Sequence, residues 1–267
     1  MEEYVKFAIA KGLKSYGFSS HAPLPFPTAW NTNLDDFPYY QAEFYRLKEK
    51  YSSQIELFLG LEIDFINDVF NAKSNLYDTD NFDYKIGSIH YLDPLPEGGF
   101  FSVDGNFYNF EKGLHQIYEG DIRVAAERFF EISTLMIENG GFDIVGHVDK
   151  ISLNGSKNPD FYIKDSWYVN SVEDILQLIK NKGLILEINT KSYLDKGFTY
   201  PDIQFFPLIH ELDIPVVISS DCHYPDKITD GFEPVMNILI KSGFKTMQQL
   251  TTAGWQAVEF NDKGLIV

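Results

Sequence analysis

The sequence has few cysteines and lacks any long apolar run. Its 267 residues contain one cysteine, Cys222, which excludes a disulfide framework within the chain and favours a reducing compartment. No apolar run approaches the roughly 18 residues that a membrane span requires. The first residues are acidic where a signal peptide would be basic. These absences predict a cytoplasmic protein that does not insert into a membrane.

Positive charge is also scarce. The chain has 22 Lys and Arg against 39 Asp and Glu, a net charge of −17, and its only arginines are Arg46, Arg123 and Arg128. Nucleic-acid backbones and anionic lipids both bind through clustered basic side chains. We therefore expect neither partner, whereas an acidic composition is compatible with a protein that collects divalent cations.

Apolar residues are plentiful, at 44% of the chain, with 16% aromatic, which is enough to bury a full core. Short apolar runs alternate with stretches of helical periodicity, the pattern of βαβ units with a parallel sheet. The length suits one α/β barrel domain over residues 1–267. The predicted strands are 14–20, 55–64, 84–91, 142–149, 183–190 and 215–223.

Helices are predicted where caps and apolar spacing agree. They cover residues 1–11 and 121–139, a segment that begins at Ser171 and ends at Gly183, residues 202–212 with Pro201 in the first turn, and residues 233–241. Three stretches rich in Asn, Asp, Gly and Pro, at 67–83, 93–120 and 150–168, are predicted as long loops of the functional kind.

Each predicted strand ends in polar residues, and most of these can bind metal. In a β/α barrel the carboxyl ends of the strands meet at one mouth. Buried imidazoles and carboxylates without a shared partner would cost several kcal/mol each, and a divalent cation supplies that partner. Mixed donors of this kind suit zinc, iron or manganese. The candidate ligands are His21, Glu62, His90, His147, Asp221 and His223.

The remaining histidines and the cysteine are predicted to be structural. His115 lies in a predicted loop and His210 on a predicted helix. Strand alternation would place Asp221 and His223 on one face and turn Cys222 away from it.

Five motifs together resemble the PHP (polymerase and histidinol phosphatase) superfamily, most closely its histidinol-phosphatase branch. They are Ser-Ser-His21-Ala-Pro-Leu-Pro, Leu-Glu62-Ile-Asp, Gly-Ser-Ile-His90, Gly-His147-Val-Asp149 and Ser-Asp221-Cys-His223. The resemblance implies a distorted seven-stranded β/α barrel with up to three metal ions. It also implies hydrolysis of a small phosphate ester, L-histidinol phosphate, in histidine biosynthesis.

Roles for single residues follow from the same resemblance. Glu62 would bridge two metals, Asp221 would bind the first, and His90 and His147 the second. His21 and His223 would belong to the third. Lys150, Lys191 and Lys196 follow strands and are candidates for holding the phosphate, with a solvated surface lysine as the alternative for each. Asp149 is a candidate proton donor to the leaving group.

The chain departs from the family at its beginning. Family members open with a strand carrying His-x-His, whereas this sequence begins at the helix that would follow it. We expect a barrel without its first strand. One metal site should keep its ligands (Glu62, His90, His147), and the other two should lack some of theirs. Our hypothesis is that Met1 is an internal methionine of a longer product. The alternatives are a PHP phosphoesterase for another small monoester or phosphotyrosine, and a non-catalytic, incompletely metallated barrel. The oligomeric state is open.

Overall fold

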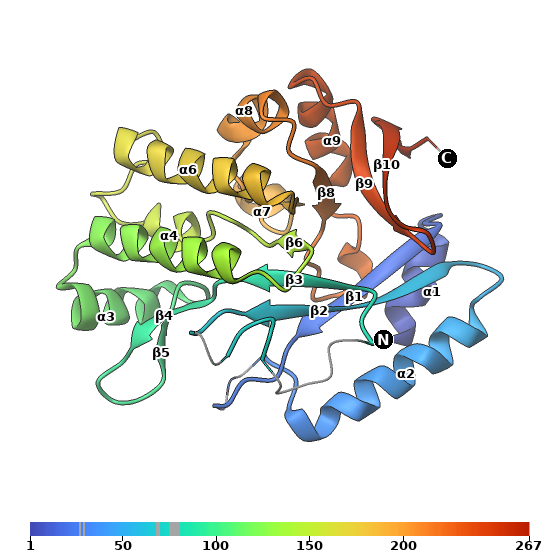
Figure 1. Cartoon of the computed structure of the whole chain (residues 1–267), viewed down its shortest axis with the longest axis horizontal. Helices are drawn as coiled ribbons and strands as arrows, with labels where there is room; N and C mark the ends of the chain where they lie inside the picture. The colour runs from blue at the N-terminus through green and yellow to red at the C-terminus, as the bar shows by residue number, and fades with distance from the viewer. Residues whose placement is uncertain (27, 29, 68–69, 75–80, 267) are drawn as a thin grey trace.

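The fold is built on one curled parallel sheet, seen in a computed structural model that describes residues 1–26, 28, 30–67, 70–74 and 81–266. Its order is β1-β2-β3-β6-β7-β8, with every pairing parallel. The strands are β1 (Ser15–His21), β2 (Glu56–Asp64), β3 (Tyr84–Ser88), β6 (Ile144–Val145), β7 (Ile185–Asn189) and β8 (Val216–Ser219). All six predicted strands are present, and the prediction of an α/β barrel-type fold is confirmed (Figure 1).

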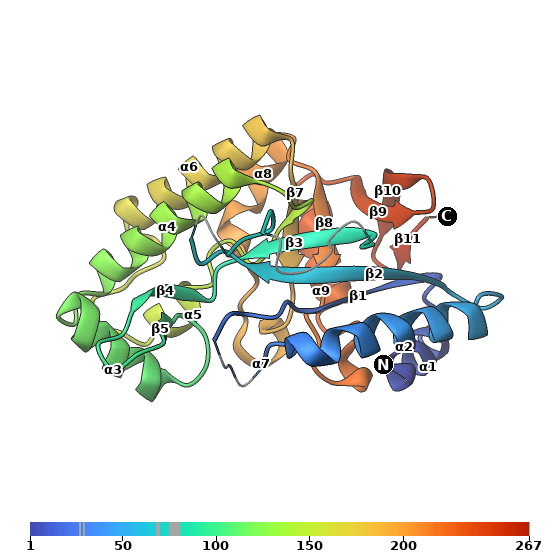
Figure 2. The ribbon, with the colours of Figure 1, turned by 60° about the horizontal axis from the view of Figure 1, so that its bottom comes forward.

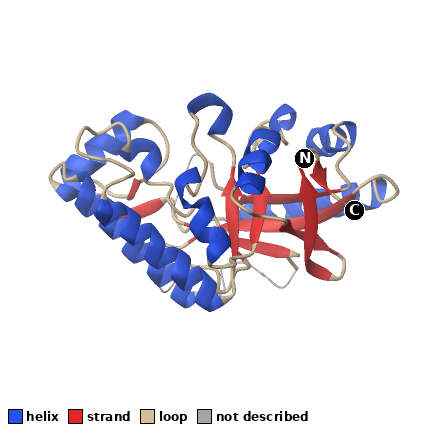
Figure 3. Ribbon diagram, turned by 90° about the horizontal axis from the view of Figure 1, so that it is seen from above, coloured by secondary structure: helices blue, strands red, loops and turns tan. Residues whose placement is uncertain are grey.

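Helices lie on the outside of this sheet (Figure 3). Figure 2 shows α4 and α6 running side by side along one flank, while α1 and α2 lie beside β1 and β2. The helices are α1 (Glu2–Ala10), α2 (Phe37–Lys50), α3 (Phe107–Tyr118), α4 (Ile122–Asn139), α5 (Ser152–Gly155), α6 (Ser166–Lys182), α7 (Tyr193–Lys196), α8 (Phe206–Glu211) and α9 (Phe232–Lys241). None of the described helices is long and apolar enough to cross a membrane.

Strand β2 shows why its sequence folds in this way. Leu57, Leu59 and Leu61 alternate with Phe58, Gly60 and Glu62, and alternate residues of a strand point to opposite faces. Leu57 and Leu59 pack in the cluster that contains α1 and α2 residues, whereas Phe58 joins Tyr84, Ile86, Ile144 and Ile185 in another. Both faces of the sheet are therefore buried, as the continuous apolarity of the strands predicts.

The sheet does not close into a seven-stranded barrel within the described residues. No strand pairs with the outer edge of β1 or of β8, and both strands line one cavity of about 1080 Å³. A separate antiparallel sheet of β9 (Thr246–Thr251), β10 (Gly254–Asn261) and β11 (Gly264–Leu265) contributes Leu250 and Trp255 to the same cavity.

Three helical predictions are wrong in detail. Ser171 does not begin a helix, because α6 starts at Ser166 and the Ser171 hydroxyl donates to the Trp167 carbonyl inside it. Pro201 precedes the helical segment, which is split into a short 3-10 turn (Ile203–Phe205) and α8. Helix α2 lies in a segment for which no helix was predicted.

The predicted loop at 93–120 is also wrong. It contains all of α3, so that His115 is helical, together with β5 (Phe100–Ser102) and the end of its hairpin partner β4 (Tyr91–Pro94). The predicted loop at 150–168 includes α5 and the start of α6. Of the predicted loop at 67–83, residues 68–69 and 75–80 lie outside the described residues.

Candidate metal centre

Glu62 lies at the centre of a buried cluster of histidines. Its Oε1 is 3.0 Å from His147 Nε2 and 3.7 Å from His90 Nε2, and its Oε2 is 3.4 Å from His21 Nδ1. The Ser88 hydroxyl donates to Oε1 at 2.7 Å. Four residues from the ends of four neighbouring strands, His21, Glu62, His90 and His147, are thus brought together as the sequence predicts.

The cluster has the charge balance of a cation site. Although burial raises the pKa of Glu62, the three histidines hold it well below its usual range. Ligand atoms of Glu62, His90 and His147 lie within 4.8 Å of one another. Among the described residues, His21 Nδ1 and His147 Nδ1 are buried and have no hydrogen bond. Because unpaired buried nitrogens are costly, this donor set fits a divalent cation.

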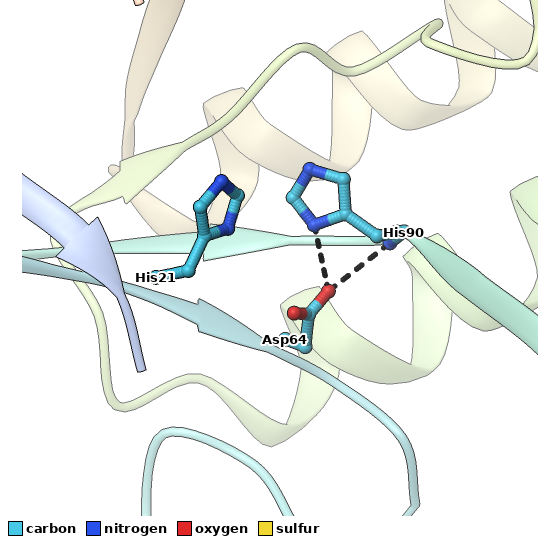
Figure 4. A group of neighbouring side chains, drawn as sticks. All are labelled: His21, Asp64 and His90. Atoms are coloured by element: carbon cyan, nitrogen blue, oxygen red, sulfur yellow. Dashed lines mark hydrogen bonds and ion pairs between the residues drawn. The ribbon is translucent and has the colours of Figure 1, made fainter. Parts of the chain in front are cut away.

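Asp64 was not among the predicted site residues, yet it belongs to the cluster. Its Oδ1 lies 2.8 Å from His90 Nδ1 and accepts the His90 backbone N–H at 3.2 Å (Figure 4). Together with Glu62, Asp64 raises the pKa of His90 to about 9 against the lowering effect of burial. The signal was available in the sequence, because Asp64 stands two residues after Glu62 and must share its face of the strand.

The last two candidate ligands form a second group beside the first. Asp221 Oδ1 is 3.3 Å from His223 Nε2, and the rings of His21 and His223 are 6.1 Å apart between centroids. Burial raises the pKa of Asp221, but His223, Lys191 and Lys150 hold it well below its usual value. The whole set therefore surrounds one mouth of the sheet.

The reason that Asp221 and His223 meet is not the predicted strand alternation. Strand β8 ends at Ser219, and Asp221 has a positive φ of 43° in the turn that follows. This turn directs Cys222 toward β1, where its Sγ is 3.7 Å from the Tyr16 hydroxyl. Likewise His147 follows β6, which ends at Val145.

Two further residues support these ligands and were not predicted. Glu187 accepts the backbone N–H of His147 at 2.7 Å and the Asn189 side-chain amide at 3.2 Å. The same amide donates to Asp221 at 3.1 Å. Burial raises the pKa of Glu187. Strand β7 thereby links the two groups of ligands through hydrogen bonds.

The predicted phosphate-binding lysines line a cavity of about 450 Å³ next to the ligands. Lys150 is only 1% exposed, with its Nζ 3.3 Å from Asp104 and over the Tyr200 ring. The surface-lysine alternative is therefore wrong for Lys150. Lys191 lies against Asp221 and His223, and Lys196 is exposed in α7.

Asp149 lies away from this cavity. It is fully buried, and it accepts the Asp202 backbone N–H at 2.9 Å and the Tyr168 hydroxyl at 3.3 Å. Burial raises its pKa to about 7. His115 and His210 are exposed and are not among the residues that line either cavity.

Comparison with known proteins identifies relatives of this chain. A sequence profile of the PHP domain matches residues 1–191. The histidinol-phosphatase of Bacillus subtilis is 25% identical over 250 residues, which cover 87% of this chain and 90% of the relative. A Deinococcus radiodurans protein named probable histidinol-phosphatase is 25% identical over 249 residues, 92% of this chain and 88% of the relative.

A solved structure shows the same fold. It is the histidinol phosphate phosphatase of Lactococcus lactis, complexed with zinc, L-histidinol and phosphate, with a TM-score of 0.73 and 22% identity over 100% of this chain and 92% of its own. The matched profile spans more than half of the residues and contains four of the six candidate ligands. The chain belongs to the PHP domain family.

Proposed function

We propose that the protein is a metal-dependent phosphatase that hydrolyses L-histidinol phosphate to L-histidinol and phosphate. The observation that carries the proposal is the buried Glu62 cluster with its three histidines, beside a cavity that carries lysines. The names of the relatives and the ligands of the Lactococcus lactis structure support the substrate.

Glu62, His90, His147 and His21 would hold the divalent metal. Bound zinc, manganese or iron supplies Lewis-acid stabilisation of phosphoryl oxygens and makes a bound water more acidic. The chain prepares the site by fixing the ligands. Asp64 holds His90 through Nδ1, and Ser88 holds the Glu62 carboxylate, which sets the directions of the metal-facing atoms before binding.

Lys150 and Lys191 provide the positive charge for a phosphate group. Lys150 is held in place by Asp104 and by the Tyr200 ring, so it enters the cavity as a fixed point charge. We propose the more exposed Lys196 as an auxiliary contact. Asp149 is not among the described residues that line this cavity. Its role as proton donor to the leaving group stays a prediction.

We also propose a cytoplasmic location and a single domain over residues 1–267. A lone cysteine is consistent with a reducing compartment. The largest core cluster contains residues from Ala22 to Phe260, which supports one domain.

A panel of phosphate esters tests the function. The full chain, loaded with Mn²⁺ or Zn²⁺, should hydrolyse L-histidinol phosphate with a kcat/KM roughly 100-fold or more above that for phosphotyrosine, sugar phosphates and glycerol phosphate. Glu62→Gln should remove nearly all of this activity, whereas Glu259→Gln, an exposed residue of β10, should retain it. Comparable turnover of every ester would contradict the substrate assignment, and no turnover of any ester would support the non-catalytic alternative.

A further inference from the structure

Lys191 reaches into the space between two candidate metal ligands. Its Nζ lies 3.1 Å from Asp221 Oδ1 and 2.9 Å from His223 Nε2. The two ligand atoms are themselves 3.3 Å apart. The ammonium group therefore lies within hydrogen-bond distance of both ligand atoms.

The hydrogen-bonding groups of Lys191, Asp221 and His223 allow the lysine ammonium to take the position of a metal cation. A lysine ammonium has three donors and no acceptor. A hydrogen bond between the two groups therefore requires His223 Nε2 to be the acceptor. An acceptor nitrogen is also the form in which a histidine binds a metal. Asp221 likewise presents an ionised oxygen, as it would to a metal.

The position of Lys191 is fixed by the fold. It follows β7 directly, and its backbone N–H donates to the Asn189 side-chain oxygen at 3.1 Å. The amide of the same Asn189 donates to the other oxygen of Asp221. One short segment thus holds both the lysine and the carboxylate that it pairs with.

The neighbouring group of ligands has no such substitute. The described residues place no lysine or arginine within ion-pair distance of Glu62, which contacts histidines and Ser88. Glu62 is thus paired with histidines, which can give up a proton to bind a metal ion, whereas Asp221 is paired with the ammonium of a lysine.

We infer that Lys191 takes the place of a divalent ion between Asp221 and His223, so that this chain binds metal at the Glu62 group and not at the Asp221–His223 pair. The inference rests on the proposed function only in assuming that the Glu62 group binds metal. Lys191 would then act as an internal cation, and the protein would need fewer metal ions.

Metal counting tests this assignment. The full chain is stripped with a chelator, equilibrated with excess Mn²⁺ or Zn²⁺, separated from free ion by gel filtration and analysed by elemental mass spectrometry. Lys191→Met keeps an unbranched side chain that is one atom shorter and removes its charge. It should bind one more ion per chain than the native protein, and isothermal titration should show one additional site.

Two matched variants locate the additional ion. Lys196→Met removes a lysine of the same cavity that forms no ion pair within the described part of the chain. The metal content of this variant should equal that of the native protein. Adding Asp221→Asn to Lys191→Met should return the metal content to the native number. Thermal unfolding of each variant confirms that the counted protein is folded.

Equal metal content in Lys191→Met and the native protein would overturn the inference. A raised KM for substrate with unchanged metal content would also overturn it, because it would assign Lys191 to the phosphate alone. The proposed function fails separately: a native chain that does not hydrolyse L-histidinol phosphate, but gains an ion on Lys191→Met, would leave the lysine assignment intact.

Discussion

His90 Nδ1 lies 2.8 Å from Asp64 Oδ1 (Figure 4). The other ring nitrogen, Nε2, lies 3.7 Å from Glu62 Oε1. A carboxylate in this position fixes the tautomer of a ligand histidine and increases its basicity. Asp64 is therefore a positioning residue for the metal centre.

Asp64→Asn should weaken metal affinity by roughly 10–100-fold, the usual effect of losing such a partner. Competition with a chromogenic chelator measures the change. Asp83→Asn is the matched control, because Asp83 also accepts a backbone N–H, that of Leu59. Asp83 stands just before β3 begins, whereas the ligands follow the other end of that strand. Equal losses in both variants would show that Asp64 acts through folding and not through His90.

The charge on His90 makes the metal-free protein sensitive to alkaline pH. Its pKa is raised from 6.5 to about 9, so the folded state binds this proton more tightly than the unfolded state. The resulting stability is fully present below about pH 6.5 and is lost as the pH rises to about 9. The loss is on the order of a few kcal/mol.

Urea unfolding of the metal-free chain between pH 6 and pH 9.5 measures this effect. His90→Asn should lose less stability over that interval than the native chain. His210→Asn, which changes an exposed histidine of α8, should follow the native curve. If the native chain keeps constant stability across the interval, His90 is not protonated in the cluster.

The sequence specified the strands and the candidate ligands better than the helices and the connections. The ligands could be predicted because each one ends an apolar run, and a parallel sheet gathers such ends at one edge. Helix α2 was missed because it is rich in Tyr and charged residues, and only Phe37, Phe44 and Leu47 are buried. Contact with the outer face of β2 stabilises it, which no local pattern reports.

Interactions between residues that lie far apart in the chain could not be predicted from the sequence. Lys191 was predicted to hold phosphate, but its pairing with Asp221 depends on the turn after β8, where Asp221 adopts a positive φ. Lys150 was weighed as a surface residue, but Asp104, 46 positions earlier in the chain, makes its burial possible. Such pairs become visible only when the backbone places both partners.

An ion pair outside the site should stabilise the β4–α4 contact. Arg128 of α4 donates to both oxygens of Asp93 at 2.9–3.2 Å, and the Tyr118 hydroxyl donates to Asp93 at 2.6 Å. Asp93→Asn should cost on the order of 1 kcal/mol, since the pair is one-third exposed and screened.

The acid dependence has the opposite sign to that of His90. Although burial raises the pKa of Asp93, Arg128 and Tyr118 lower it overall, so the contribution is present above its usual pKa of 3.8 and lost as the pH falls below it. Denaturant unfolding at pH 7 and pH 3 should show a smaller difference between native and Asp93→Asn proteins at pH 3. A constant difference would contradict the ionic origin.

Two glycines, Gly17 of β1 and Gly60 of β2, leave room for the side chain of Tyr84 on the face of the sheet that carries Phe58. A Cβ at Gly60 would lie 2.3 Å from the ring of Tyr84, and a Cβ at Gly17 would lie 2.5 Å from its hydroxyl. Tyr84 is buried and packs against Trp255 of β10 at 6.1 Å between ring centroids. The ring therefore has little room to move away from an added methyl group.

Gly60→Ala should destabilise the protein by about 1–3 kcal/mol through overpacking. In the double variant Gly60→Ala, Tyr84→Leu, the clash with the ring is absent, so the two single losses should add to more than the loss measured for the pair. Urea unfolding of the four proteins gives this coupling energy directly. Strict additivity would mean that β2 shifts to accommodate the methyl group, and that contact with the Tyr84 ring is not the cause of the destabilisation.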